Sequence, residues 1–122
     1  MSKIIELKKE MILVYGTRCW LSLLKENRLT AHHIKPVRDK GKTEWGNIAL
    51  LSNDSHIYFN QIEKFAPNIA HELNILFYEL NKTYAPPTLD YEEEVQRVLR
   101  KVRWKIWKYW SYYYLVLLYL LF

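Results

Sequence analysis

Five polar residues between positions 32 and 60 are of the types that hydrolytic metal sites use. They are the adjacent histidines His32 and His33, followed by Asn47, His56 and Asn60. Imidazole nitrogens and amide oxygens both ligate divalent metal ions. A neutral imidazole, with an ordinary pKa of about 6.5, can also accept a proton at physiological pH. The set therefore predicts proton transfer beside a bound cation.

The expected secondary structure brings these residues together. Residues 29–34 and 47–51 are short apolar runs typical of strands, and residues 55–65 are expected to form a helix. Neighbours on a strand face opposite sides, so one histidine of the pair can bind a metal while the other does a different task. Residues four apart on a helix, such as His56 and Asn60, share a face.

The sequence around these residues resembles the HNH endonucleases, also called His-Me finger or ββα-metal nucleases. The resemblance rests on the run from Leu29 to Pro36, on Gly41 in the following loop, on residues 47–51 and on His56. It covers about residues 16–84 and is closest to phage and bacterial members. It implies an α+β fold in which a small ββα-metal core is flanked by helices.

The resemblance also implies a role for each polar residue. His33 matches the general base that takes a proton from the attacking water, and Asn47 matches the asparagine that holds the inter-strand loop and so orients the base. His32 and His56 match metal ligands, and Asn60 is the candidate for a further ligand on the helix. The implied cofactor is a divalent metal, Mg²⁺ first, with Mn²⁺ or Zn²⁺ as alternatives, which stabilises the leaving oxygen. The implied activity is hydrolysis of DNA phosphodiester bonds.

A structural zinc ribbon is not expected. Many members of the family carry CxxC pairs that bind zinc, but Cys19 is the single cysteine of this sequence. One thiol makes neither an internal disulfide nor a four-cysteine site, which fits a reducing compartment. Trp20 and Leu21 are expected to pack where the zinc would lie.

Four basic residues in or beside the loop between the strands are candidates for phosphate contact: Lys35, Arg38, Lys40 and Lys42. The alternative is an ordinary solvated loop. The adjoining metal site favours nucleic-acid binding, which would add affinity without base specificity. The chain carries 18 Lys and Arg against 13 Asp and Glu, a net charge of +5, which mildly favours DNA as the partner.

The chain is expected to divide into a nuclease domain over 1–84, with its core at about 29–65, a Pro-rich linker over 85–90 and a helical segment over 91–122. Half of its residues are apolar and a quarter are charged, which argues against disorder. Two further helices are expected to flank the core.

These flanking helices are expected from Ser2 to Gly16 and from Pro67 to near Tyr84, and Asp90 is expected to cap the last helix of the chain. The first residues lack the apolar core of a signal peptide, so the expected location is the cytoplasm, for a protein of bacterial or phage origin.

The C-terminal segment is expected to be a long basic and aromatic helix. It carries six basic residues against three glutamates, and the fourteen residues after Lys108 are uncharged. Residues 104–122 have three alternatives: packing on the core or on a second copy of the chain, contact with a membrane, or a nucleic-acid arm. Fourteen residues of helix reach about 21 Å, which is short for a hydrocarbon core of about 30 Å.

Two functions thus stay open. The first is a metal-dependent endonuclease. The second is a catalytically inactive HNH scaffold that binds nucleic acid or another partner, with peripheral membrane association through the C-terminal helix.

Overall fold

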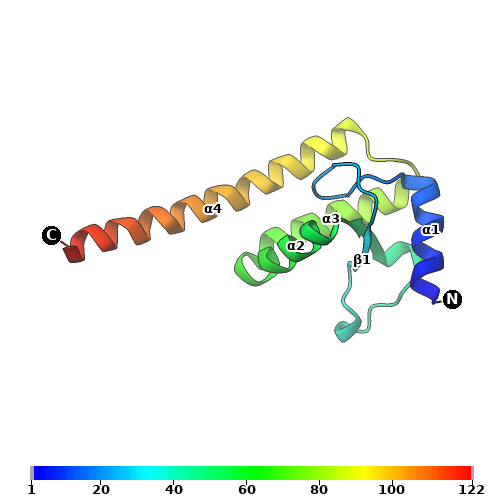
Figure 1. The fold of residues 1–122 in the computed structure, drawn as a ribbon, viewed down its shortest axis with the longest axis horizontal. Coiled ribbons are helices and arrows are strands. Elements are labelled where there is room, and N and C mark those ends of the chain that lie inside the picture. Colours follow the sequence, from blue (N-terminus) through cyan, green and yellow to red (C-terminus); the bar gives the residue numbers. More distant parts are fainter. Residues whose placement is uncertain (1, 122) are drawn as a thin grey trace.

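The computed structural model describes residues 2–121, and Figure 1 shows its ribbon. Over these residues the fold is α+β, with four α-helices and one two-stranded antiparallel sheet. The elements in chain order are α1 (Lys3–Tyr15), β1 (Thr30–His33), the 3₁₀ turns η1 (Val37–Asp39) and η2 (Trp45–Asn47), β2 (Ile48–Leu51), α2 (Asn53–Phe65), α3 (Pro67–Thr83) and α4 (Leu89–Leu121).

The bounds expected for the first helix are confirmed. The Ser2 hydroxyl accepts the N–H of Ile5 at 3.4 Å, which satisfies one of the free donors of the first turn. Gly16 ends the helix at a φ of 86°, a value that favours glycine, and donates its N–H to Ile12.

The two strands form a hairpin that pairs Thr30 with Leu51 and His33 with Ile48. Both strands are shorter than the sequence predicted. Asn47 lies in η2, because its N–H bonds to the carbonyl of Glu44 and folds the chain into a 3₁₀ turn. The first strand therefore ends at His33, and only one further hydrogen bond, from Ile34 N–H to Asn47 O, continues the pairing.

Helix α2 begins earlier than expected, at Asn53, because the Ser52 hydroxyl caps it by accepting the Ser55 N–H at 3.2 Å. Helix α3 begins at Pro67. Proline suits this position because the N–H that it lacks would make no hydrogen bond within the first turn of a helix. It ends before Tyr84, which has a φ of 49°. Both helices pack against the hairpin.

The core joins these elements into one apolar cluster. All four residues of β2 are buried, so this strand lies at the centre. The prediction that Trp20 and Leu21 pack in the core is confirmed, since both are at most 1% exposed. The cluster also contains residues of every helix, among them Met11, Phe59, Leu73, Phe77, Val95, Val98 and Val102.

Helix α4 is one continuous helix of 33 residues, whose first turns pack on α3. Val95, Val98 and Val102 provide its buried face. The expected cap, Asp90, is wrong: the Thr88 hydroxyl, two residues earlier, accepts the N–H of Tyr91 at 3.3 Å. The C-terminal part, orange to red in Figure 1, extends beyond all the other elements.

Candidate active site

The candidate site lies where β1 meets α2 and α3. The His32 ring is buried on the helix side of the hairpin, with ring-centroid distances of 4.4 Å to Phe59, 5.9 Å to Phe77 and 5.5 Å to His56. Alternation along the strand brings Thr30 to the same side as His32 and turns His33 to the other. The hairpin therefore separates the adjacent histidines, as the sequence predicted.

The buried ring of His32 has a defined tautomer. Its Nε2 lies 3.0 Å from Oδ1 of Asn74, and an amide oxygen only accepts hydrogen bonds. Nε2 therefore carries the proton, and Nδ1 carries the lone pair. Within residues 2–121, Trp20 Nε1 is the one buried side-chain nitrogen or oxygen without a hydrogen-bond partner. His32 Nδ1 makes no hydrogen bond, so its lone pair has no partner within the described residues.

His56 is fixed by Thr30 in the opposite tautomer. The Thr30 hydroxyl donates its single proton to the Leu51 carbonyl at 2.9 Å. It must therefore accept from His56 Nδ1, which lies 2.8 Å away. The proton of His56 is thus on Nδ1, and Nε2 carries the free lone pair. Each of the two neighbouring rings presents one unbonded basic nitrogen.

Both rings are neutral at neutral pH. Burial lowers the pKa of His32 to about 4, although the hydrogen bond to Asn74 acts in the other direction. Burial also lowers the pKa of His56, and repulsion from His33 lowers it further. Neutral imidazole is the form that binds metals, and the lowered pKa of both rings favours that form.

His33 is half-buried on the other side of the hairpin, at the start of the inter-strand loop. Its Nε2 lies 2.9 Å from the hydroxyl of Thr43, which comes from the far end of that loop. Repulsion from His33 contributes to the lowered pKa of both His32 and His56, so the three imidazoles are electrostatic neighbours.

Asn47 ties the two ends of the inter-strand loop together. Its Oδ1 accepts the N–H of Lys35 at 2.7 Å, and its Nδ2 donates to the carbonyls of Lys35 at 3.0 Å and Lys42 at 2.8 Å. These bonds hold the backbone that follows His33. The geometry fits the loop-holding role that the family resemblance implied.

Gly41 lets the loop fold back on itself. A Cβ atom at this position would lie 1.8 Å from the carbonyl oxygen of Lys35, so no larger residue fits without a shift of the backbone. The Gly41 N–H instead donates to the Pro36 carbonyl at 2.9 Å. A single glycine therefore suffices for this loop.

Three of the four basic candidates line one hollow, and the fourth is paired. Lys35, Lys40 and Lys42 are exposed around a depression whose floor includes Asn47. Arg38 is also exposed, but its guanidinium lies 3.3 Å from the carboxylate of Glu63 at the end of α2. Phosphate contact by these residues stays a prediction.

The metal-ligand set is sparse. Asn60 is exposed on α2, one turn after His56. Over the part of the chain that the structure describes, no three or more His, Cys, Asp and Glu side chains gather as a metal site. The candidate donors are therefore two imidazoles and one amide. Such a set leaves other positions around a cation to water or phosphate oxygens.

Sequence reasoning missed the residues that hold the histidines. Thr30 could have been found, because it lies two positions before His32 and so shares its strand face. Thr43 and Asn74 gave no signal. They reach His33 and His32 across 10 and 42 positions of the sequence.

Cys19 is buried and unpaired, and its thiol contacts backbone N–H groups. Its fully buried thiol accepts the N–H groups of Leu21, Ser22 and Ser52 at 3.4, 3.4 and 3.2 Å. Burial raises the thiol pKa, but hydrogen bonds involving Ser22, Ser55 and Ser52 outweigh it, so the pKa lies below its ordinary value. Serine residues thus surround the one cysteine of the sequence.

Comparison with known proteins gives one match. Residues 17–56 match the family model described as HNH endonuclease. The matched segment contains the hairpin, its loop and four of the five candidate residues: His32, His33, Asn47 and His56. No curated protein and no solved structure matches the chain.

Proposed function

Because residues 17–56 carry an HNH endonuclease domain, we propose that this protein is a metal-dependent endonuclease that hydrolyses DNA phosphodiester bonds. The observation that supports the proposal most is the arrangement of the three histidines. His32 and His56 are held as neutral rings with one free nitrogen each, and His33 lies across the hairpin from them.

His33 is the proposed general base. For it to accept a proton while it keeps its hydrogen bond to Thr43, Nε2 must donate to the hydroxyl and Nδ1 must carry the lone pair. Thr43 then orients the ring, as the partner of a catalytic histidine commonly does. Asn47 fixes the backbone that joins His33 to this loop, and so limits the movement of the ring.

The donor chemistry of the site fits a divalent cation. His32 Nδ1, His56 Nε2 and the Asn60 amide oxygen are the side-chain groups that would hold it. Two nitrogen donors favour Mn²⁺ or Zn²⁺ more than Mg²⁺, which prefers oxygen ligands. A bound cation would supply positive charge that stabilises the leaving oxygen. Lys35, Lys40 and Lys42 are the proposed contacts to the DNA backbone.

Plasmid nicking tests the proposal. Purified protein is incubated with supercoiled plasmid and Mn²⁺ or Mg²⁺, beside the variants His33→Ala and His71→Ala. His71 is exposed on α3 outside the three-histidine cluster, so its variant is the matched control. We expect His33→Ala to lose roughly 10²- to 10⁴-fold of the nicking rate and His71→Ala to keep it. Equal nicking by His33→Ala and the unaltered protein would contradict the proposal.

An inactive HNH scaffold is the alternative. The packing of His32 against Phe59 and Phe77 is also what a histidine with only a structural role would show. In that case the protein would retain DNA in a gel-shift experiment, with no nicking under any divalent metal and no metal binding by calorimetry.

A further inference from the structure

The C-terminal part of α4, residues 104–121, is rich in exposed apolar and aromatic side chains. Its buried face ends at Val102, and the helix then leaves the core (Figure 1). Apolar and aromatic side chains stay exposed from there to the end, among them Trp104, Trp107, Trp110, Tyr112, Tyr114, Leu115, Leu117, Tyr119, Leu120 and Leu121.

The distribution of these side chains decides which partner fits. From Tyr109 onward there is no charged residue on any side of the helix. A second copy of the helix would cover one stripe and leave the other sides in water. Successive residues are about 100° apart around a helix, so the exposed Leu115, Leu120 and Leu121 point in three different directions. A helix that is apolar all round needs a surrounding that is apolar all round, and a lipid layer provides it.

The residues just before this apolar end suit the surface of a membrane. Arg100, Arg103, Lys105 and Lys108 are exposed on the helix and complement anionic headgroups. Trp104 and Trp107 stack at a centroid distance of 5.1 Å, and Trp110 follows one turn later. Tryptophan beside lysine and arginine is typical of the headgroup region, because the indole is apolar with one polar N–H.

Length limits how the helix can enter the bilayer. Over residues 2–121, no helix is sufficiently long and apolar for a membrane crossing. The uncharged stretch 109–121 spans about 20 Å, which exceeds one leaflet of about 15 Å but not the whole hydrocarbon core. Tilted entry into a single leaflet therefore fits the helix.

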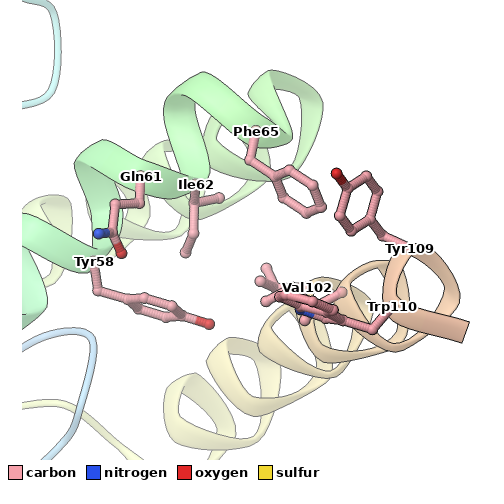
Figure 2. A pocket seen from close by; sticks show the side chains of 8 residues that line it. Tyr58, Gln61, Ile62, Phe65, Val102, Tyr109 and Trp110 are labelled. Atoms are coloured by element: carbon pink, nitrogen blue, oxygen red, sulfur yellow. The ribbon is translucent and has the colours of Figure 1, made fainter. Parts of the chain in front are cut away.

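A groove beside the helix continues the apolar surface towards the core. Tyr58 and Phe65 of α2 face Val102, Tyr109 and Trp110 of α4 across it (Figure 2). The ammonium group of Lys105 lies 5.3 Å from the centre of the Phe65 ring at this place. The positively charged side chain of Lys105 thus lies where the apolar surface meets the basic part of the helix.

We propose that residues 109–121 insert into one leaflet of an anionic membrane, and that the basic residues before them, from Arg100 to Lys108, contact the lipid headgroups. The nuclease domain is then held at the membrane surface. This inference rests on the exposed residues of α4 and does not depend on nuclease activity.

Vesicle flotation of the full-length protein tests this proposal. The vesicles are phosphatidylcholine alone or phosphatidylcholine mixed with phosphatidylglycerol. The first variant combines Leu117→Asp with Leu120→Asp, and its matched control combines Leu13→Asp with Leu24→Asp, two exposed leucines elsewhere. We expect the unaltered protein and the control to float with the anionic vesicles, and the first variant to bind more than tenfold more weakly.

The basic residues are tested by combining Lys105→Gln with Lys108→Gln. Each lost charge should weaken binding to the anionic vesicles by about fivefold. Tryptophan emission of the unaltered protein should shift to shorter wavelength on binding, because Trp104, Trp107 and Trp110 leave water.

Three results would overturn the proposal. One is that the variant with Leu117→Asp and Leu120→Asp floats with the anionic vesicles as well as the unaltered protein does. Another is flotation that depends on the lysines alone, which would show electrostatic adsorption to the headgroups without insertion of the helix. The third is failure of the unaltered protein to float while it sediments as a stable oligomer, which would assign the helix to a second copy of the chain.

Discussion

Thr30 decides which nitrogen of His56 is free to bind a ligand. Its hydroxyl donates to Leu51 and accepts from His56 Nδ1, so loss of the hydroxyl frees the ring to change tautomer or to rotate. We predict that Thr30→Val lowers the affinity for Mn²⁺ by about 10- to 100-fold, the usual effect of losing a partner that orients a ligand. Isothermal titration calorimetry measures this affinity.

Thr30→Ser is the matched control, because it keeps the hydroxyl and should keep most of the affinity. Nitrogen-15 NMR of the metal-free protein should show the proton of His56 on Nδ1 in the unaltered protein and in Thr30→Ser. If Thr30→Val leaves the Mn²⁺ affinity unchanged, Thr30 does not orient His56 for metal binding. This conclusion does not depend on the nuclease activity.

His32 makes the stability of the metal-free protein depend on pH. Its pKa is about 4 in the folded chain and about 6.5 when unfolded, so the unfolded chain binds more protons between these values. The stabilisation is complete above pH 6.5 and is lost as the pH falls towards 4. We predict that the free energy of unfolding falls by about 2 kcal/mol from pH 7 to pH 5 because of this residue.

Urea denaturation at several pH values, in the presence of EDTA, measures the slope of the free energy of unfolding against pH. His32→Gln should flatten it, whereas His71→Ala, which removes an exposed histidine, should not. A slope that is the same in His32→Gln as in the unaltered protein would show that His32 is not desolvated in the fold.

At the scale of elements, the inter-strand loop depends on one glycine. Gly41→Ala would place a methyl group against the Lys35 carbonyl, whereas a Cβ at Gly46 meets nothing within 4 Å. We predict that Gly41→Ala lowers the free energy of unfolding by roughly 2 kcal/mol and lowers any nicking activity, since the loop carries Thr43 and is held by Asn47. Thermal unfolding, followed by circular dichroism, measures the first effect.

Gly46→Ala, in the same loop, is the control and should stay within about 0.5 kcal/mol of the unaltered protein. Equal effects of the two substitutions would show that the close approach of Gly41 to Lys35 does not exist in solution.

The ends of helices could be predicted from the sequence where they depend on side chains only a few residues away. The cap at Ser2, the proline at the start of α3 and the glycine after α1 act within one turn, so the sequence pattern reveals them. The cap of α4 was assigned wrongly because Thr88 and Asp90 are both good capping residues, and only the backbone conformation selects between them.

At the scale of the whole molecule, α4 contributes to stability only through its first part. Val98 is fully buried against the core, whereas Tyr112 is 70% exposed. We predict that Val98→Ala lowers the free energy of unfolding by roughly 2 kcal/mol, because it removes buried methyl groups and leaves a cavity. Tyr112→Ala should change it by less than about 0.5 kcal/mol. Urea denaturation followed by circular dichroism compares the two variants.

A large loss of stability in Tyr112→Ala would mean that the C-terminal part of α4 is covered by protein in solution. That result would also count against insertion of the free helix into lipid.

The candidate site was predictable in part because its motif lies in one segment of the chain. His32, His33, Asn47 and His56 follow one another within 25 residues, and a hairpin followed by a helix brings them together. Asn74 could not be predicted, because it reaches His32 only after α3 has packed on the hairpin. The route of α4 away from the core likewise depends on where its valine face ends.

The most direct test of the account is a crystal structure of the protein soaked in Mn²⁺, with the metal located by its anomalous scattering. We predict one strong site with His32 Nδ1 and His56 Nε2 both within about 2.0–2.3 Å of the ion, and with His33 nearby but not bound. A metal bound elsewhere on the chain, with His32 still closed against Phe59 and no ion near His56, would contradict it.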